Sequence, residues 1–186
     1  MIDARQKPLI ELQREFREGS TNAMPIAGMI AWALLGVAAL FLSEPLIANG
    51  ALYIMVLVMP LAWVIERLRG RNLFAGGDEP LTKLFLLSIV GLAILIPIAV
   101  IAASAADAPL LIVLGMALVT GAIWVPYGWA ADDPVGLRRA IAQAVGSYAA
   151  YAFMPAPFTA SAICAVVVLC YIYVLVAARP MGSANA

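Results

Sequence analysis

Apolar positions dominate the chain in long blocks that short polar segments separate. Six of these blocks are about twenty residues long, and a helix that crosses the bilayer core needs about 20 apolar residues. The corresponding membrane spans are expected at 23–42, 46–65, 84–104, 109–129, 135–155 and 158–178. The pattern therefore predicts an all-α, polytopic membrane protein with six transmembrane helices.

A shorter amphipathic segment precedes the first span. Leu9, Leu12 and Phe16 recur at helical spacing, and charged residues occupy the other faces. We expect a short cytoplasmic helix that lies on the membrane surface or against the bundle, with docking onto a partner protein as the alternative. The expected organisation is this helix within residues 1–20, the transmembrane domain at 21–179 and a flexible tail at 180–186.

Composition supports the membrane assignment. Hydrophobic residues make up 65% of the chain and charged residues 12%, with a mean hydropathy of +0.99. Soluble domains have about 45–50% apolar and about 25% charged residues. The 11 basic and 11 acidic residues cancel, so no net field would attract nucleic acid. Membrane lipids are the expected surroundings, and no nucleic-acid partner is expected.

The distribution of charge predicts the topology. With six spans, all 11 basic residues fall on one side of the membrane. By the positive-inside rule this side is the cytoplasm, which predicts a multi-pass protein of the bacterial inner (plasma) membrane with both termini cytoplasmic. The connections on the other side are very short, so the spans are expected to pack as three antiparallel hairpins. The fifth span is the weakest, and without it the C-terminus would change side.

Few residues in the chain are suited to catalysis or metal binding. There is no histidine, and Cys164 and Cys170 lie about 9 Å apart along one predicted helix, too far for a disulfide. We expect no ionisable residue deep in a span, because Glu66 and Lys83 lie at cytoplasmic ends where their side chains can reach water. No nucleophile–base pair is present. The chain is therefore not expected to be an enzyme, to hold a metal or to need a cofactor.

Prolines and acidic pairs mark the ends and the interiors of spans. Asp78-Glu79 and Asp132-Asp133 each precede a proline at the start of a span, where carboxylates cap free helix N–H groups; a divalent cation is the alternative. Pro60 and Pro97 lie within spans and predict kinks, either as hinges or as fixed bends.

Span five carries a polar row. Gln143, Ser147 and Tyr151 recur every four residues, with Tyr148 beside them. One interpretation is a buried central helix held by interhelical hydrogen bonds, and the other is the polar lining of an intramembrane cavity. The residues of span four that would complete this cavity are Thr120, Trp124 and Tyr127.

Span four ends with Pro126, Tyr127, Gly128 and Trp129. With six short spans behind a charged N-terminal helix, this element resembles a bacterial family of small, uncharacterised six-helix membrane proteins whose fourth span ends in a Pro-aromatic-Gly-Trp element. The resemblance implies the fold over nearly the whole chain but no activity and no catalytic residues. The same four residues can also form a kinked, anchored helix end.

These observations favour a non-enzymatic membrane protein. The leading hypothesis is that it binds or passes a small neutral or lipidic molecule through a cavity between spans four and five. The alternative is an accessory or structural subunit, as a homo-oligomer or within a larger membrane complex.

Overall fold

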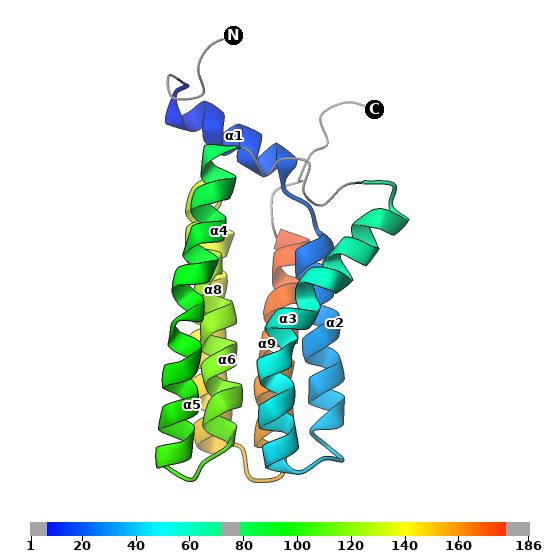
Figure 1. Cartoon of the computed structure of the whole chain (residues 1–186), viewed down its shortest axis with the longest axis vertical. Helices are drawn as coiled ribbons and strands as arrows, with labels where there is room; N and C mark the ends of the chain where they lie inside the picture. Colours follow the sequence, from blue (N-terminus) through cyan, green and yellow to red (C-terminus); the bar gives the residue numbers. More distant parts are fainter. Residues whose placement is uncertain (1–6, 72–78, 178–186) are drawn as a thin grey trace.

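The computed structural model describes residues 7–71 and 79–177, and within them the fold is all α with no strand (Figure 1). The expected tail at 180–186 and Asp78 of the first acidic pair lie outside the described residues. The helices are α1 (Leu9–Gly19), α2 (Ala23–Ala38), α3 (Glu44–Leu68), α4 (Pro80–Ala93), α5 (Leu95–Ala105), α6 (Leu110–Ala122), α7 (Trp124–Ala130), α8 (Val135–Phe153) and α9 (Thr159–Ala177).

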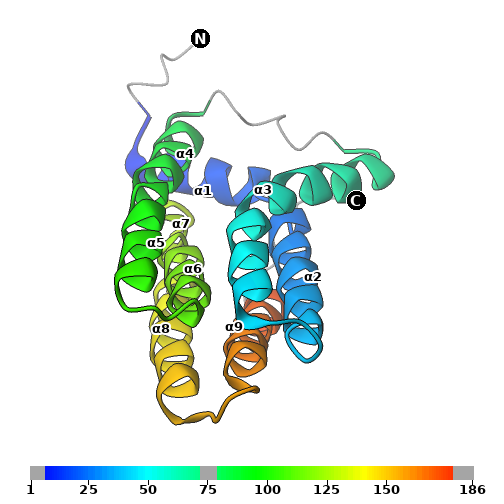
Figure 2. The ribbon, with the colours of Figure 1, turned by 60° about the horizontal axis from the view of Figure 1, so that its bottom comes forward.

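The long helices run side by side, and α1 lies across one end of the bundle (Figures 1 and 2). α9 packs against both α2 and α8, α2 also packs against α3, and α6 contacts α3, α5 and α8. The ends of α3, α4 and α8 that carry basic residues lie at the same end of the bundle as α1. Basic side chains thus gather at one end, as the charge pattern predicts.

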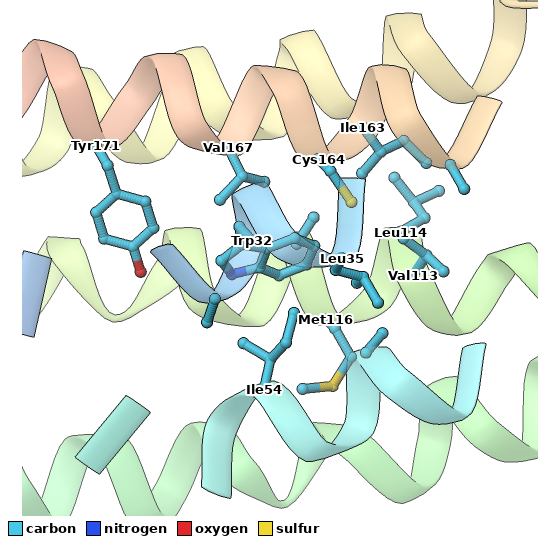
Figure 3. Close-up of a cluster of buried hydrophobic side chains, with 14 of the residues drawn as sticks. Trp32, Leu35, Ile54, Val113, Leu114, Met116, Ile163, Cys164, Val167 and Tyr171 are labelled. Carbon is cyan, nitrogen blue, oxygen red and sulfur yellow. The ribbon is translucent and has the colours of Figure 1, made fainter. Parts of the chain in front are cut away.

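The main core lies between α2, α3, α6 and α9 (Figure 3). Trp32 of α2 is fully buried there beside Met116 of α6 and Ile163 of α9. Small residues let the helices approach: a Cβ on Gly36 would lie 2.9 Å from the Cβ of Cys164. Cys164 and Cys170 are both free and buried, which confirms the prediction that they are small core residues.

Prolines interrupt three of the long helices. The breaks at Ile94, between α4 and α5, and at Ile123, between α6 and α7, each fall three residues before a proline, Pro97 or Pro126. A proline has no N–H for the carbonyl four residues earlier and its ring crowds that carbonyl, so the helix breaks just there. Within α3, Glu44–Ile54 and Val56–Leu68 are bent by 51°, five residues before Pro60. The kink predicted near Pro60 is confirmed, and near Pro97 the helix is interrupted at Ile94.

Several helices are long and apolar enough to cross a membrane. Three meet this condition outright, namely Pro80–Ala105, Leu110–Ala130 and Thr159–Ala177, and up to five do if the two bent pairs each count as one span. α8 is not among them. The exposed faces of α4, α5 and the break between them carry large apolar residues, which suits contact with lipid: Leu84, Leu87, Val90, Ile94, Ile98 and Ile101.

Candidate functional site

α8 turns a row of polar side chains into the bundle. Arg139, Gln143 and Ser147 follow at intervals of four residues, and each has 0% of its surface exposed. Residues four apart lie on one face of a helix, so these three form what we call the inner polar row. Tyr151 continues the row and is half-buried, whereas Tyr148 is 62% exposed and faces out of the bundle.

Sequence reasoning places Arg139 among the basic residues at the start of span five and does not identify it as a buried residue. This residue is only about 6 Å along the axis from the start of α8, but its side chain packs inward instead of reaching water. Its position one turn before Gln143 is the sequence signal that could have revealed this, because it places Arg139 on the same face as the polar row.

The Arg139 guanidinium is held between two aromatic rings. Its Cζ lies 3.9 Å from the ring centroid of Trp124 and 3.7 Å from that of Tyr171. Each cation–π contact of this kind stabilises a guanidinium by about 0.5–2 kcal/mol. The two rings are nearly perpendicular, at 82° with centroids 6.3 Å apart, so they contact the group from two different sides. Its Nε, Nη1 and Nη2 have no hydrogen-bond partner among the described residues.

Gln143 joins α8 to α6. Its Nε2 donates to the carbonyl of Ala117 at 2.7 Å and to Oγ1 of Thr120 at 3.2 Å. A carbonyl can only accept, so this bond fixes the amide orientation and turns Oε1 the other way. Oε1 of Gln143 and Oγ of Ser147 have no hydrogen-bond partner within the described part of the chain. The structure thus brings Gln143 and Thr120 together, as the sequence predicts.

α7 and α8 cross where both have glycine. A Cβ on Gly136 would lie 2.4 Å from the Trp124 carbonyl oxygen and 2.6 Å from Cα of Gly128. Only glycine permits so close a backbone approach at this crossing. The contact fixes the register in which Trp124 faces Arg139. One turn further along both helices, Thr120 contacts Gln143.

The Pro-aromatic-Gly-Trp element has a structural role at each position. Pro126 separates α7 from α6, and Gly128 allows the crossing with α8. The ring of Tyr127 makes edge contacts with Phe16 at 5.7 Å and with Trp124 at 4.9 Å between centroids. Trp129 is about half exposed, and its carbonyl accepts a hydrogen bond from the α1 residue Gln13 at 2.8 Å.

α1 docks on the bundle through its apolar face. Phe16 is buried and contacts the rings of Phe85 and Tyr127 at 5.9 and 5.7 Å between centroids. This arrangement matches the expectation of a helix that lies against the bundle. At the same end, burial raises the pKa of the Glu79 carboxyl, and nearby Glu15 raises it further while Lys7 opposes the shift.

A second ionisable residue is also buried, which corrects the expectation that Glu66 reaches water. Glu66 has 0% of its surface exposed, and Nη1 of Arg69 lies 3.7 Å from its Oε1. Ala62, one turn earlier on α3, packs with Ala23 and Ala27 of α2, so the same face carries Glu66 inward. The predicted capping is found at Asp133, whose Oδ1 accepts the N–H of Val135 at 3.0 Å at the start of α8. It is not found at Glu79, the N-cap residue of α4, whose side chain makes no capping hydrogen bond.

Two open hollows lie away from the inner polar row. One of about 560 Å³ runs beside α1 and includes Ile10, Arg14 and Asp132. The other, of about 250 Å³, lies at the opposite end of the bundle beside Asn49 and Asp107. The described residues contain no group of His, Cys, Asp and Glu that could hold a metal ion.

Comparison with known proteins places the chain in a family. Neither a curated protein nor a solved structure shows a significant match. The profile of a family of unknown function, DUF7010, matches residues 9–179, from the first residue of α1 to just beyond α9. The resemblance to an uncharacterised family is confirmed to this extent. The chain therefore belongs to the family of unknown function DUF7010.

Proposed function

We propose that this chain is a non-enzymatic, six-span protein of the bacterial inner membrane that binds or passes a small neutral or lipidic molecule between spans four and five. In this proposal α6 and α7 form span four, and α8 forms span five. The six spans are then the three helices that qualify outright, the bent α3, and α2 and α8. Inclusion of α2 and α8 is supported by their packing along α9, which is itself long and apolar enough to cross a membrane. The gathering of basic residues at one end supports a cytoplasmic location for both termini.

One observation carries the proposal of a ligand. The inner polar row keeps buried polar atoms without a hydrogen-bond partner among the described residues, on Arg139, Gln143 and Ser147 in turn. In a helix that serves packing alone, buried polar groups are normally satisfied by neighbouring groups, since each unmade bond costs about 1–3 kcal/mol. The two bonds from Gln143 to α6 support a packing role, but its oxygen and the Ser147 hydroxyl remain for a ligand.

The test is whether a molecule co-purifies through this row. The full chain is extracted together with its surrounding lipid and denatured, and the released small molecules are quantified by mass spectrometry. We expect a defined molecule at a constant ratio to wild-type protein, and a strong loss of it in Gln143→Leu. Tyr148→Phe is the control, because it removes an exposed hydroxyl from the same helix.

Two results decide against this function. Equal retention by wild type and Gln143→Leu would show that the row does not bind the molecule. If Gln143→Leu does not insert, Ser147→Ala makes a smaller change at a fully buried position and carries the same expectation. A wild-type protein that releases no defined molecule would also contradict the proposal.

An accessory role in a larger membrane complex is the second candidate. It is favoured by Leu9 and Ile10, which stay exposed on α1 beside the hollow of about 560 Å³ after Phe16 has been buried. Large exposed apolar residues next to charged ones are typical of docking surfaces. Ile10→Ser should then reduce the size of the complex extracted in native lipid, and an unchanged size would count against this role.

A further inference from the structure

The charge of Arg139 is not balanced by the described residues. Their ion pairs join Lys7 to Glu15, Arg14 to Glu18 and Arg69 to Glu66, at other places in the fold. Arginine keeps its proton in proteins, so the site holds a permanent buried cation. Leaving such a charge unpaired is among the most costly arrangements in a protein interior.

The N–H groups of the guanidinium set the direction from which a partner can bind. They point outward in the plane of the group, so an acceptor must approach its edge, beside the contacts with Trp124 and Tyr171. A phosphate or a carboxylate fits this edge, because two of its oxygens can each accept one of two parallel N–H bonds.

A second unpartnered donor lies on helix α2, which packs along α9 as α8 does. The indole Nε1 of the fully buried Trp32 has no hydrogen-bond partner in the described ranges. Figure 3 shows the nitrogen edge of this ring on the side toward Tyr171. The Tyr171 hydroxyl group packs against Gly28, which lies one turn before Trp32. A Cβ added to Gly28 would lie 2.3 Å from the hydroxyl oxygen of Tyr171. Tyr171 therefore lies between Arg139 and the part of α2 that carries this donor.

From these donors we infer that the ligand of the inner polar row carries an anionic oxygen group, a phosphate or a carboxylate, which the Arg139 guanidinium binds edge-on. This inference rests on the proposed function and changes its ligand class: it excludes neutral molecules, keeps lipids with an anionic headgroup and adds free anions. Arg139 lies about one turn from the start of α8, the end of this helix that is at the α1 side of the bundle. In the proposed orientation this end lies among the lipid headgroups. The anionic group comes either from such a headgroup or from a free anion that reaches the same edge.

The experiment titrates the purified full chain in neutral detergent with three probes and follows its melting temperature. The probes are phosphatidylglycerol, phosphatidylcholine with the same acyl chains, and inorganic phosphate. We expect saturable stabilisation of the wild type by phosphatidylglycerol and much less by phosphatidylcholine. A shift with inorganic phosphate as well would identify the free anion as sufficient, and a shift with the lipid alone would identify the headgroup.

Variants locate the effect. Arg139→Gln should weaken the response to the anionic probe by about tenfold or more, the range for one charged hydrogen-bond partner. Arg138→Gln removes the exposed neighbouring cation and should respond like the wild type. Equal responses of wild type and Arg139→Gln would overturn the inference. If Arg139→Gln does not fold, the wild type decides by itself: native mass spectrometry must show one bound anionic lipid in preference to the zwitterionic one, and no preference would overturn it.

The outcomes separate the two proposals. A neutral molecule bound at a one-to-one ratio and lost in Gln143→Leu, with no response to anionic probes, would keep the proposed function and reject the anionic ligand. A wild type that binds none of these probes and releases no defined molecule would reject both.

Discussion

Gly128 and Gly136 hold the backbones of α7 and α8 in direct contact. A Cβ added to Gly136 would lie 2.6 Å from Cα of Gly128, and one added to Gly128 would lie 2.9 Å from Cα of Gly136. This mutual approach sets the register between the two helices and thereby places Trp124 against Arg139. The crossing is therefore the structural basis of the candidate site.

Gly136→Ala should disrupt this crossing. The added methyl group meets backbone atoms that cannot move aside, so we expect the free energy of unfolding to fall by about 1–3 kcal/mol. Gly91→Ala is the matched control, since nothing lies within 4 Å of its added Cβ and alanine favours a helix. Thermal unfolding in detergent measures both. Equal melting temperatures for the two variants would contradict the role of the crossing.

Phe16→Ala should release α1 from the bundle. Its buried ring contacts Phe85 and Tyr127, and removing a fully buried aromatic side chain costs about 3–5 kcal/mol. Limited proteolysis should therefore cut within α1 much faster than in the wild type. Ile10→Ala, at a position that is 74% exposed, should leave the rate unchanged. If both variants are cut at the wild-type rate, Phe16 does not hold α1.

Glu79 should make the stability of this end depend on pH. Burial raises its pKa above the ordinary 4.5, so the folded state holds the proton more tightly than the unfolded state does. The stability that this proton contributes is complete below pH 4.5 and is lost as the pH rises through the folded-state pKa. Glu79→Gln should thus stabilise the protein at about pH 7 and have little effect at about pH 4. Melting temperatures at both pH values test this, with a substitution of an exposed residue, Glu44→Gln, as the control. The same stabilisation by Glu79→Gln at both pH values would refute the prediction.

The aromatic pair around Arg139 should be coupled to its charge. Tyr171→Leu removes one of the two cation–π contacts, whereas Tyr173→Leu changes a partly exposed ring that lies two residues away. We expect Tyr171→Leu to lower the free energy of unfolding more than Tyr173→Leu does. A double-mutant cycle of Tyr171→Leu with Arg139→Met should give a coupling energy of about 0.5–2 kcal/mol. A coupling energy of zero would show that the rings merely fill space.

Much of the fold follows from hydrophobic pattern. The amphipathic α1, the apolar helices and the kinks near Pro60 and Pro97 are all predictable, because helical period and proline chemistry act locally. The inward placement of Arg139 and Glu66 is not local in this sense. It depends on which face of α8 or α3 the neighbouring helices cover. From the sequence alone, a charged residue near the end of a span is expected to reach water and anchor the helix at the interface.

The candidate site was predictable in part. Gln143 and Thr120 meet, as expected from their positions on spans five and four. Tyr148 faces outward because it is one residue beyond the buried Ser147 on the helix. Tyr171 carries no signal in the sequence, because its part in the site arises from tertiary packing between α8 and α9.

The most direct test of a ligand at the inner polar row is photo-crosslinking with a diazirine-bearing anionic lipid, followed by peptide mapping. The informative signal is the labelling that an excess of unlabelled lipid removes. The account predicts that this saturable labelling falls on the inward faces of α7, α8 and α9, near Trp124, Arg139 and Tyr171, and decreases in Arg139→Gln. Saturable labelling confined to the exposed faces of α3, α4 and α5 would contradict it.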